Sequence, residues 1–230
     1  MDLITNNIGF GLVLTYIAFR GAMIIKNRFR FALANPLLIG IVTIIGFLLI
    51  LDIPYEHYKA GGDVIHFFLG PATVILAVPL YRQFKELKKN IVPIMTGVFI
   101  GSLSALVLVA LASKFFGLDP SIAASLMPKS VTMPIGLELS EALGGVAAIT
   151  VISIVVTGLT GAVFAEKTVK LFNIKNEVAQ GISIGTSAHA LGTTKAVEMG
   201  EVQGGMSGLA IGLTGIFTAI LAPLVYRLFF

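Results

Sequence analysis

The sequence predicts an all-helical integral membrane protein of seven transmembrane segments, or of eight if one predicted hairpin crosses, with discontinuous helices like those of secondary transporters. Three observations predict this fold. Of the 230 residues, 56% are hydrophobic and only 12% are charged, which is about half the charged fraction of a soluble domain. Long uncharged stretches recur along the chain, and short basic clusters separate them. Two shorter apolar segments contain glycine, proline and hydroxyl side chains, as discontinuous transmembrane helices do.

The continuous spans are predicted from their length, because a helix needs about 20 apolar residues to cross the hydrocarbon core of a bilayer. An apolar run over 3–19 predicts the first helix, with Arg20 reaching towards an interface. Four uncharged stretches have the full length on their own: 31–51, 90–113, 142–165 and 202–226. Two shorter stretches, 64–81 and 178–194, complete the predicted segments.

The basic clusters orient these segments, since Lys and Arg are enriched in cytoplasmic loops. They follow the first, third and fifth segments and close the chain: Lys26, Arg28, Arg30, Arg82, Lys85, Lys88, Lys89, Lys167, Lys170, Lys175 and Arg227. With these residues in the cytoplasm, the loops predicted over 52–63 and 114–120 lie outside, and so does the start of the helix from Gly144. The stretch 120–141 should therefore enter and leave the membrane on the same face, as a re-entrant hairpin.

The composition of this stretch supports a hairpin. Pro128 and Pro134 stand six residues apart, with Lys129 between them. A continuous helix tolerates two such prolines poorly. Non-helical backbone at membrane depth occurs only where it is buried in protein or lines a cavity. The alternative interpretation is an apolar surface loop.

The segment 178–194 contains a second interruption, because glycine and hydroxyl residues crowd its sequence GISIGTSAHALGTT. This composition predicts two half-helices that meet at an unwound centre near Gly185 to Gly192. The ends of such half-helices offer unpaired N–H and C=O groups that can bind ions near the midplane. The segment 64–81 is its predicted counterpart, interrupted at Gly70, Pro71 and Thr73.

These segments predict a single transmembrane domain over 1–230 that contains an inverted repeat, roughly 31–113 and 142–230, linked by the re-entrant segment 120–141. The last helix of each half carries a small residue at every fourth position, which lets helices approach closely. These residues are Gly97, Gly101 and Ala105 in one half and Gly204, Gly208 and Gly212 in the other. Inverted repeats with paired broken helices are typical of secondary transporters with a midplane site.

Three motifs of the chain resemble the LrgB/CidB family of bacterial membrane proteins. GTSAHALGTTKA is similar to the family pattern GxSSHAxGTAxA, LMPKSVTMPIGLELS to its PKSVTTPIA segment, and FFLGPATVILAVPLYRQ to its LGPATVALAxPLY segment. They occur in the family's order, and the family's length agrees with the whole chain. The chain departs from the pattern at Ala188, where a second serine is common, and at Met133, Thr194 and Lys195. If relatives bind substrate through a serine at position 188, that contact is missing here.

The resemblance implies one of two functions. The family was named for antiholin-like modulators of murein hydrolase export and autolysis, which act with a holin-like LrgA/CidA membrane partner. Related proteins include the plastid glycolate/glycerate translocator, and bacterial members are linked to pyruvate uptake. The broken helices and the intramembrane lysine favour transport of a small carboxylate of the pyruvate, glycolate, glycerate or lactate type by alternating access. The alternative is the antiholin-like regulator.

Lys129 is the first candidate for binding this carboxylate, since a charge at membrane depth is costly and usually functional. Its alternative role is an ion pair with Glu138 or Glu141. His189 is a candidate for proton coupling or for a structural hydrogen bond, and Glu138 is the second proton-coupling candidate. The hydroxyl residues have helix capping as their alternative role. The predicted substrate-binding residues are Lys129, Ser130, Thr132, Gly185, Thr186, Ser187, His189, Gly192, Thr193, Thr194, Pro71 and Thr73.

The sequence does not predict an enzyme. Lys129 and Ser130 are neighbours in the chain, so their spacing does not predict a catalytic dyad, and no HExxH, GxSxG or P-loop pattern occurs. Cysteine is absent, and we expect neither a metal ion nor another cofactor. The basic residues lie in short loops, so we expect no nucleic-acid partner. We expect a multi-pass protein of the cell membrane that forms a homo-oligomer through its glycine faces.

Overall fold

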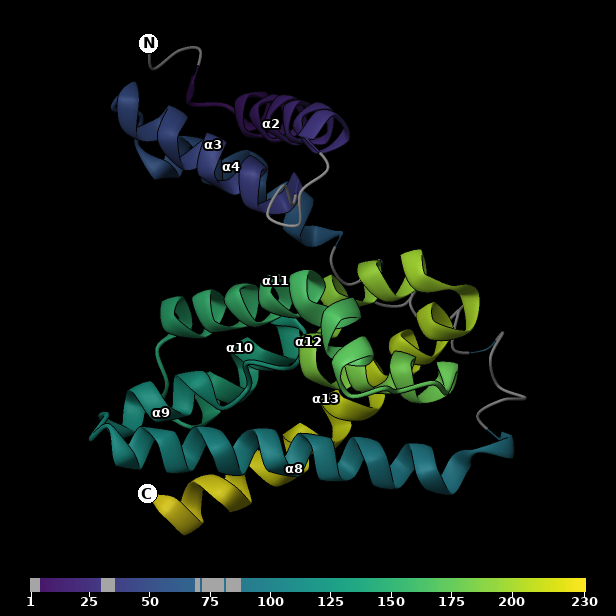
Figure 1. Ribbon diagram of the computed structural model, residues 1–230. Helices are drawn as coiled ribbons and strands as arrows, with labels where there is room; N and C mark the ends of the chain where they lie inside the picture. The colour runs from purple at the N-terminus through teal and green to yellow at the C-terminus, as the bar shows by residue number, and fades with distance from the viewer. Residues whose placement is uncertain (1–4, 30–35, 69–70, 72–80, 82–87) are drawn as a thin grey trace. The chain divides into compact units, whose positions relative to one another are not determined.

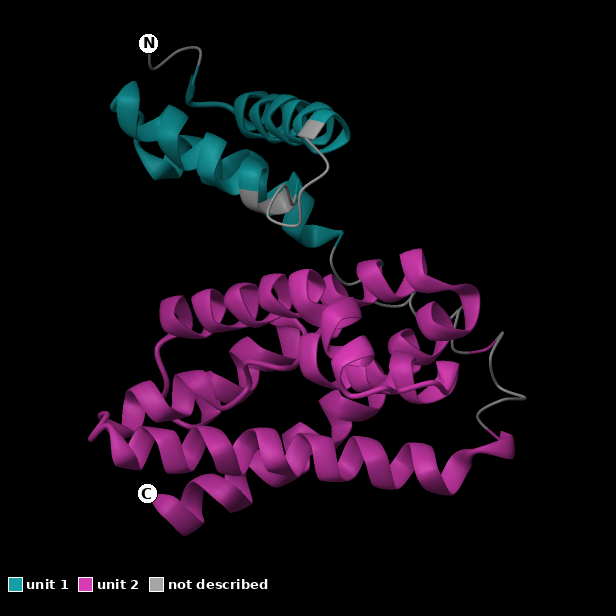
Figure 2. Cartoon of the chain, viewed as in Figure 1, with its two compact units in different colours: residues 1–75 teal, residues 76–230 magenta. Residues whose placement is uncertain are grey.

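The computed structural model describes residues 5–29, 36–68, 71, 81 and 88–230. Helices and their connections make up this described part, and it contains no strand. The chain divides into two units, residues 1–75 and 76–230, which Figure 2 colours separately. Each unit has its own set of packed helices.

The described part of unit 1 contains the helices α2 (Ile8–Phe29), α3 (Pro36–Ile50) and α4 (Tyr55–Phe67) (Figure 1). Two glycines bring the backbones of α2 and α4 together, since a Cβ atom on Gly61 would lie 2.7 Å from the Cα atom of Gly11. Beside this contact, the Thr15 and Tyr58 hydroxyl groups lie 3.1 Å apart. The sequence predicted a loop over most of the α4 residues. That prediction is wrong, because packing against α2 stabilises a helix whose own sequence is polar.

From residue 88 onwards, unit 2 is built from three long helices, a helical hairpin and a broken helix. In chain order these are α8 (Ile91–Phe115), α9 (Pro120–Leu126), α10 (Met133–Ala142), α11 (Ala147–Leu171), α12 (Glu177–Met199) and α13 (Glu201–Phe229). α12 packs against α8, α11 and α13. A core of Ile94, Val98, Ile182, Met206 and Leu209 joins α8, α12 and α13.

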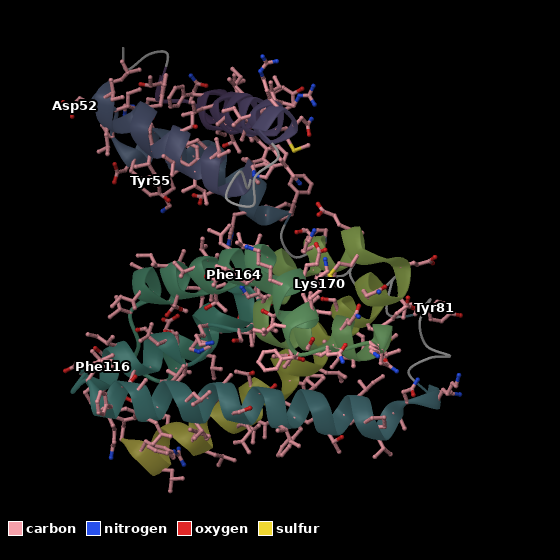
Figure 3. All side chains as sticks on the ribbon, in the orientation of Figure 1. Asp52, Tyr55, Tyr81, Phe116, Phe164 and Lys170 are labelled. Atoms are coloured by element: carbon pink, nitrogen blue, oxygen red, sulfur yellow. The ribbon has the colours of Figure 1, made fainter. Side chains whose placement is uncertain are left out.

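Four described helices are long and apolar enough to cross a membrane: Ile8–Arg28, Ile91–Phe115, Ala147–Leu171 and Glu201–Phe229. The shorter apolar helix Ile39–Ile50 accompanies them. Large hydrophobic side chains are exposed along these helices, as a lipid-facing surface requires; Phe116, just after α8, and Phe164, on α11, are two that Figure 3 labels. The protein is therefore a multi-pass helical membrane protein. The exact number of spans stays a prediction.

The hairpin is formed by α9 and α10, which flank the turn at 127–132. With 7 and 10 residues, these helices are about 11 and 15 Å long at 1.5 Å per residue, too short to cross a bilayer core of about 30 Å. In Figure 1 the end of α8 and the start of α11 lie at the same end of unit 2, so the hairpin leaves and returns there. The Ser125 hydroxyl accepts a hydrogen bond from the Val146 N–H at 2.7 Å, which joins the last turn of α9 to the start of α11. This arrangement agrees with the predicted re-entrant segment, whose position in a membrane stays a prediction.

Helix α12 is interrupted at one residue. His189 has φ 42° and ψ −141°, which are not helical values, while the residues on both sides continue as helix. The sequence predicted an unwound centre near Gly185 to Gly192; in the structure His189 interrupts this stretch, and its other residues are helical. The helical backbone of α12 is therefore broken at a single non-helical residue.

Candidate functional site

The candidate site lies where the hairpin tip meets helix α12. Lys129 occupies the tip, and its Nζ atom donates a hydrogen bond to the Ser130 hydroxyl at 3.2 Å. Within the described residues, no carboxylate lies within 4 Å of this ammonium group. The ion pair with Glu138 or Glu141, which was the alternative role of Lys129, does not form there. The cation is therefore available to an anion from outside the chain.

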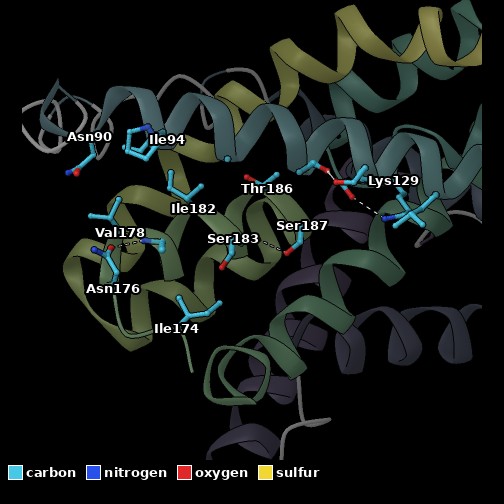
Figure 4. Close-up of a pocket in the computed structure, with 18 residues that line it drawn as sticks. Asn90, Ile94, Lys129, Ile174, Asn176, Val178, Ile182, Ser183, Thr186 and Ser187 are labelled. Atoms are coloured by element: carbon cyan, nitrogen blue, oxygen red, sulfur yellow. Dashed lines mark hydrogen bonds between the residues drawn. The ribbon is translucent and has the colours of Figure 1, made fainter. Parts of the chain in front are cut away.

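Lys129 and Ser130 line one end of a cavity of about 920 Å³ between α8 and α12, which we call the α8–α12 cavity. Figure 4 shows Lys129 at one end, Asn90 and Asn176 at the other, and Thr186 between them. Ser187 also lines this cavity. The structure thus brings together four of the predicted substrate-binding residues: Lys129, Ser130, Thr186 and Ser187.

Thr186 is the most informative hydroxyl group of the cavity. Its side chain is only 7% exposed, and its Oγ1 atom has no hydrogen-bond partner in the described structure. Burying a hydroxyl group without a partner is unfavourable. Ser102, Ser113 and Thr214 also lack a partner among the described residues, but Thr186 is the one of these four that lines the cavity, so it is the candidate for contact with a ligand. Gly101 of α8 allows this arrangement, because a Cβ atom there would lie 2.8 Å from Cγ2 of Thr186.

A second cavity, of about 540 Å³, lies between α11 and α12, and we call it the α11–α12 cavity. It shares Lys129, Ser183 and Ser187 with the α8–α12 cavity. The sequence analysis missed Ser183, which lies one helical turn before Ser187. Their spacing was the available signal, since residues i and i+4 share a helix face. Lys129 thus lines two cavities, one between α12 and α8 and the other between α12 and α11.

His189 is 4% exposed, and its Nε2 atom lies 2.9 Å from the Ile154 carbonyl oxygen. A carbonyl accepts hydrogen bonds, so Nε2 carries a proton and donates it. Gly158 makes room for the ring, because a Cβ atom there would lie 2.5 Å from Cε1 of His189. His189 therefore connects the break in α12 to α11 by a hydrogen bond, which is the structural role that the sequence analysis left open. Its proton-coupling role stays a prediction.

Two more predicted binding residues use their hydroxyl groups within the protein. Thr193 donates to the His189 carbonyl oxygen at 2.9 Å, and its Oγ1 atom lies 2.7 Å from the Ser207 hydroxyl on α13. Thr194 donates to the Leu191 carbonyl oxygen at 2.7 Å and is exposed. These contacts stabilise the second half of α12 and lie outside the two cavities.

The two glycines predicted at the break serve close packing. Gly185 faces α13, where a Cβ atom would collide with the Ser207 carbonyl oxygen. Gly192 faces its own helix, where a Cβ atom would lie 2.5 Å from the Cβ atom of Ala188. Both positions keep α12 compact around the break, and neither lines the cavities.

The remaining predicted site residues lie elsewhere. Thr132 precedes the first residue of α10, and its side chain makes no capping hydrogen bond. Glu138 is exposed on α10. Pro71 is exposed in unit 1, and Thr73 lies outside the described residues. Neither Thr132 nor Glu138 lines the two cavities, and the proposed roles of all four residues stay predictions.

A cluster of ion pairs at the far end of α11 contrasts with Lys129. Lys195 lies 3.2 Å from a Glu166 carboxylate oxygen and 3.3 Å from a Glu198 oxygen, and Lys170 lies 2.8 Å from Glu166. The carboxylates compensate these cations, so the cluster offers an added anion less attraction than Lys129 does. It connects α11 to the second half of α12.

Comparison with known proteins identifies related sequences. The model of the LrgB-like family matches residues 15–228. The chain is 40% identical to the Bacillus subtilis protein named "Uncharacterized protein YwbG", over 92% of this chain and 94% of that one. It is 35% identical to the "Antiholin-like protein LrgB" of Bacillus mycoides and of Bacillus cereus, over 94% of each chain. No solved structure matches it.

Proposed function

Because this chain belongs to the LrgB-like family, and because relatives at 35% identity are named antiholin-like proteins, we propose that it is an antiholin-like membrane protein. The sequence analysis gave this function as its alternative. The names of the relatives support it more directly than they support carboxylate transport. They describe no enzymatic activity, and the absence of catalysis stays a prediction.

In this proposal the protein modulates murein hydrolase export and autolysis together with a holin-like partner of the LrgA/CidA type. The partner follows from the family resemblance alone. Homo-oligomer formation is a further part of the proposal.

A second function, the transport of small carboxylates, is supported by the geometry of the site. The single observation that carries it is Lys129, a cation with no carboxylate within 4 Å in the described structure, at the end of a cavity. An ammonium group in such surroundings binds a carboxylate, which restores its charge balance. Ser130 offers a hydroxyl group beside it for a hydroxy or keto oxygen. Ser187 also lines the cavity; its hydroxyl group donates to the Ser183 carbonyl oxygen at 2.8 Å, so its oxygen can accept a hydrogen bond from a ligand hydroxyl group.

Alternating access would use the two cavities that share Lys129. A carboxylate bound to this lysine would face α8 in one state and α11 in the other. The break at His189 is the point where the two halves of α12 can change their angle. The two functions are compatible, since transport of a metabolite can itself control autolysis.

One variant tests both functions. We expect Lys129→Gln to lose uptake of pyruvate, glycolate, glycerate or lactate into proteoliposomes, while Lys167→Gln, on the exposed face of α11, keeps it. In parallel, detergent-induced autolysis is measured in cells that lack the chromosomal copy and carry either variant. If the unmodified protein shows no uptake but clearly changes autolysis, only the antiholin-like function remains. Normal uptake by Lys129→Gln would remove Lys129 from the transport site.

A further inference from the structure

The α8–α12 cavity is much longer than a small carboxylate. Its lining on α8 runs from Asn90 to Leu108, a distance of about 27 Å at 1.5 Å per residue. Its volume of about 920 Å³ is near the upper end of the range for drug-sized ligands, about 300–1,000 Å³. An acid of two or three carbons would fill only the end at Lys129.

The chemistry of the lining changes along this length. The Lys129 end is cationic and rich in hydroxyl groups. Beyond Thr186 the walls are formed mainly by apolar residues, such as Ile94 and Gly97 on α8 and Ile182 on α12. A ligand that matches these walls has an anionic head, a polar group close to the head, and an apolar chain.

We propose that the α8–α12 cavity binds an amphipathic hydroxy-carboxylate, with its carboxylate at Lys129, its hydroxyl group at Thr186 and its acyl chain past Gly97. This inference rests on the anion-binding role proposed for Lys129. It adds to that role the length and the polarity of the ligand's acyl chain. Thr186 supplies the independent observation, because it is one of the residues that line the cavity and its buried Oγ1 atom has no hydrogen-bond partner within the described residues.

Gly97 allows the chain to be tested. Gly97 lines the cavity and a Cβ atom there meets nothing within 4 Å, so Gly97→Leu adds a side chain at the cavity wall from a position with open space. Gly212 on α13 is a matched control, since it is also a helical glycine with open space beside it, and it does not line this cavity. Thr186→Val is nearly isosteric and removes only the hydroxyl group.

The experiment is photo-crosslinking in proteoliposomes with dodecanoate that carries a diazirine in its chain, followed by peptide mapping. We expect adducts on the cavity-lining parts of α8 and α12. Lys129→Gln should reduce them at least about tenfold, because a hydrogen bond to a charged group is lost. Gly97→Leu should also reduce them, whereas Gly212→Leu and Lys167→Gln should label like the unmodified protein.

Competition in the unmodified protein identifies the ligand class without any variant. We expect 3-hydroxydecanoate to compete better than decanoate, decanoate better than glycolate, and decanol not to compete. In Thr186→Val the advantage of 3-hydroxydecanoate over decanoate should disappear. Competition by decanol equal to that by decanoate, or equal labelling by a diazirine phosphatidylcholine, would show a bilayer acyl chain instead and would overturn the proposal. Crosslinking needs no transport, so a failure of pyruvate uptake would not affect this result.

Discussion

Gly158 of α11 lies against the imidazole ring of His189, so that a Cβ atom on the glycine would lie 2.5 Å from Cε1 of the ring. The ring cannot easily move away, because its Nε2 atom is held 2.9 Å from the Ile154 carbonyl oxygen. The break in α12 therefore depends on a glycine in a neighbouring helix.

We expect Gly158→Ala to destabilise unit 2 by about 1–3 kcal/mol, the usual cost of an overpacked core. The added methyl group would collide with His189 and with Cβ of Leu191, which lies 2.8 Å from its position. Thermal unfolding in detergent measures the effect. Gly212→Ala is the control, because open space surrounds it and alanine favours a helix more than glycine does. Equal unfolding temperatures for the two variants would contradict the close packing of Gly158 on His189.

The ion pairs around Lys195 should contribute little to stability, at most about 1 kcal/mol, because they are partly exposed. Salt screens such pairs, so the difference between the unmodified protein and Lys195→Ala should shrink in high salt. A double-mutant cycle with Glu166→Ala measures the coupling. A large coupling that salt does not change would mean that the cluster is more strongly buried than the structure shows.

The start of the hairpin should respond to pH through Asp119. Its carboxylate accepts a hydrogen bond from the Ser121 N–H at 2.8 Å, and hydrogen bonding by Ser121 lowers the pKa of Asp119. A lowered pKa means that the contribution to stability is present above the pKa of the unfolded chain and is lost as the pH falls through the folded value. We therefore expect Asp119→Ala to lower the unfolding temperature at neutral pH and to have little effect in strong acid. An effect that does not depend on pH would contradict the role of the ionised cap.

The hairpin and the break in α12 could be predicted from sequence because each has a local cause. Pro134 stands in the first turn of α10, where proline is well tolerated, and the glycines and hydroxyl residues around His189 weaken a continuous helix. Helix α4 could not be predicted, since its stability comes from the contact between Gly61 and Gly11, which lie far apart in the sequence.

The candidate site was predictable in its residue types and less so in its geometry. Lys129 and Thr186 could be chosen because polar groups are costly inside a membrane. That they line one cavity follows from the packing of the hairpin tip near α12, which no local pattern encodes. Ser183 was missed because the family motif begins two residues after it. Thr193 was chosen for its hydroxyl group, which the structure shows bonded within the protein.

The predicted orientation in the membrane can be tested by labelling, because the chain has no cysteine of its own. A cysteine introduced at Lys170, at the end of α11, should react with an impermeant maleimide only from the cytoplasmic side. A cysteine at Lys59, in α4, should react only from the outside. For each variant, the labelling in intact cells is compared with the labelling after the cells are permeabilised. Labelling of both positions from the same side would contradict the topology derived from the basic clusters.

The last prediction concerns His189 as the group that couples transport to protons. It lies at the only non-helical position within α12, and its Nε2–H donates to a backbone carbonyl oxygen. Glutamine can keep this hydrogen bond but cannot titrate, so His189→Gln should fold and bind substrate. If His189 carries the coupled proton, uptake driven by an inward pH gradient should fail in the variant, while exchange of substrate without a gradient persists. Both are measured with labelled pyruvate in the same proteoliposomes. Because a purely structural histidine would affect both activities together, a variant that still responds to the gradient would exclude the proton role.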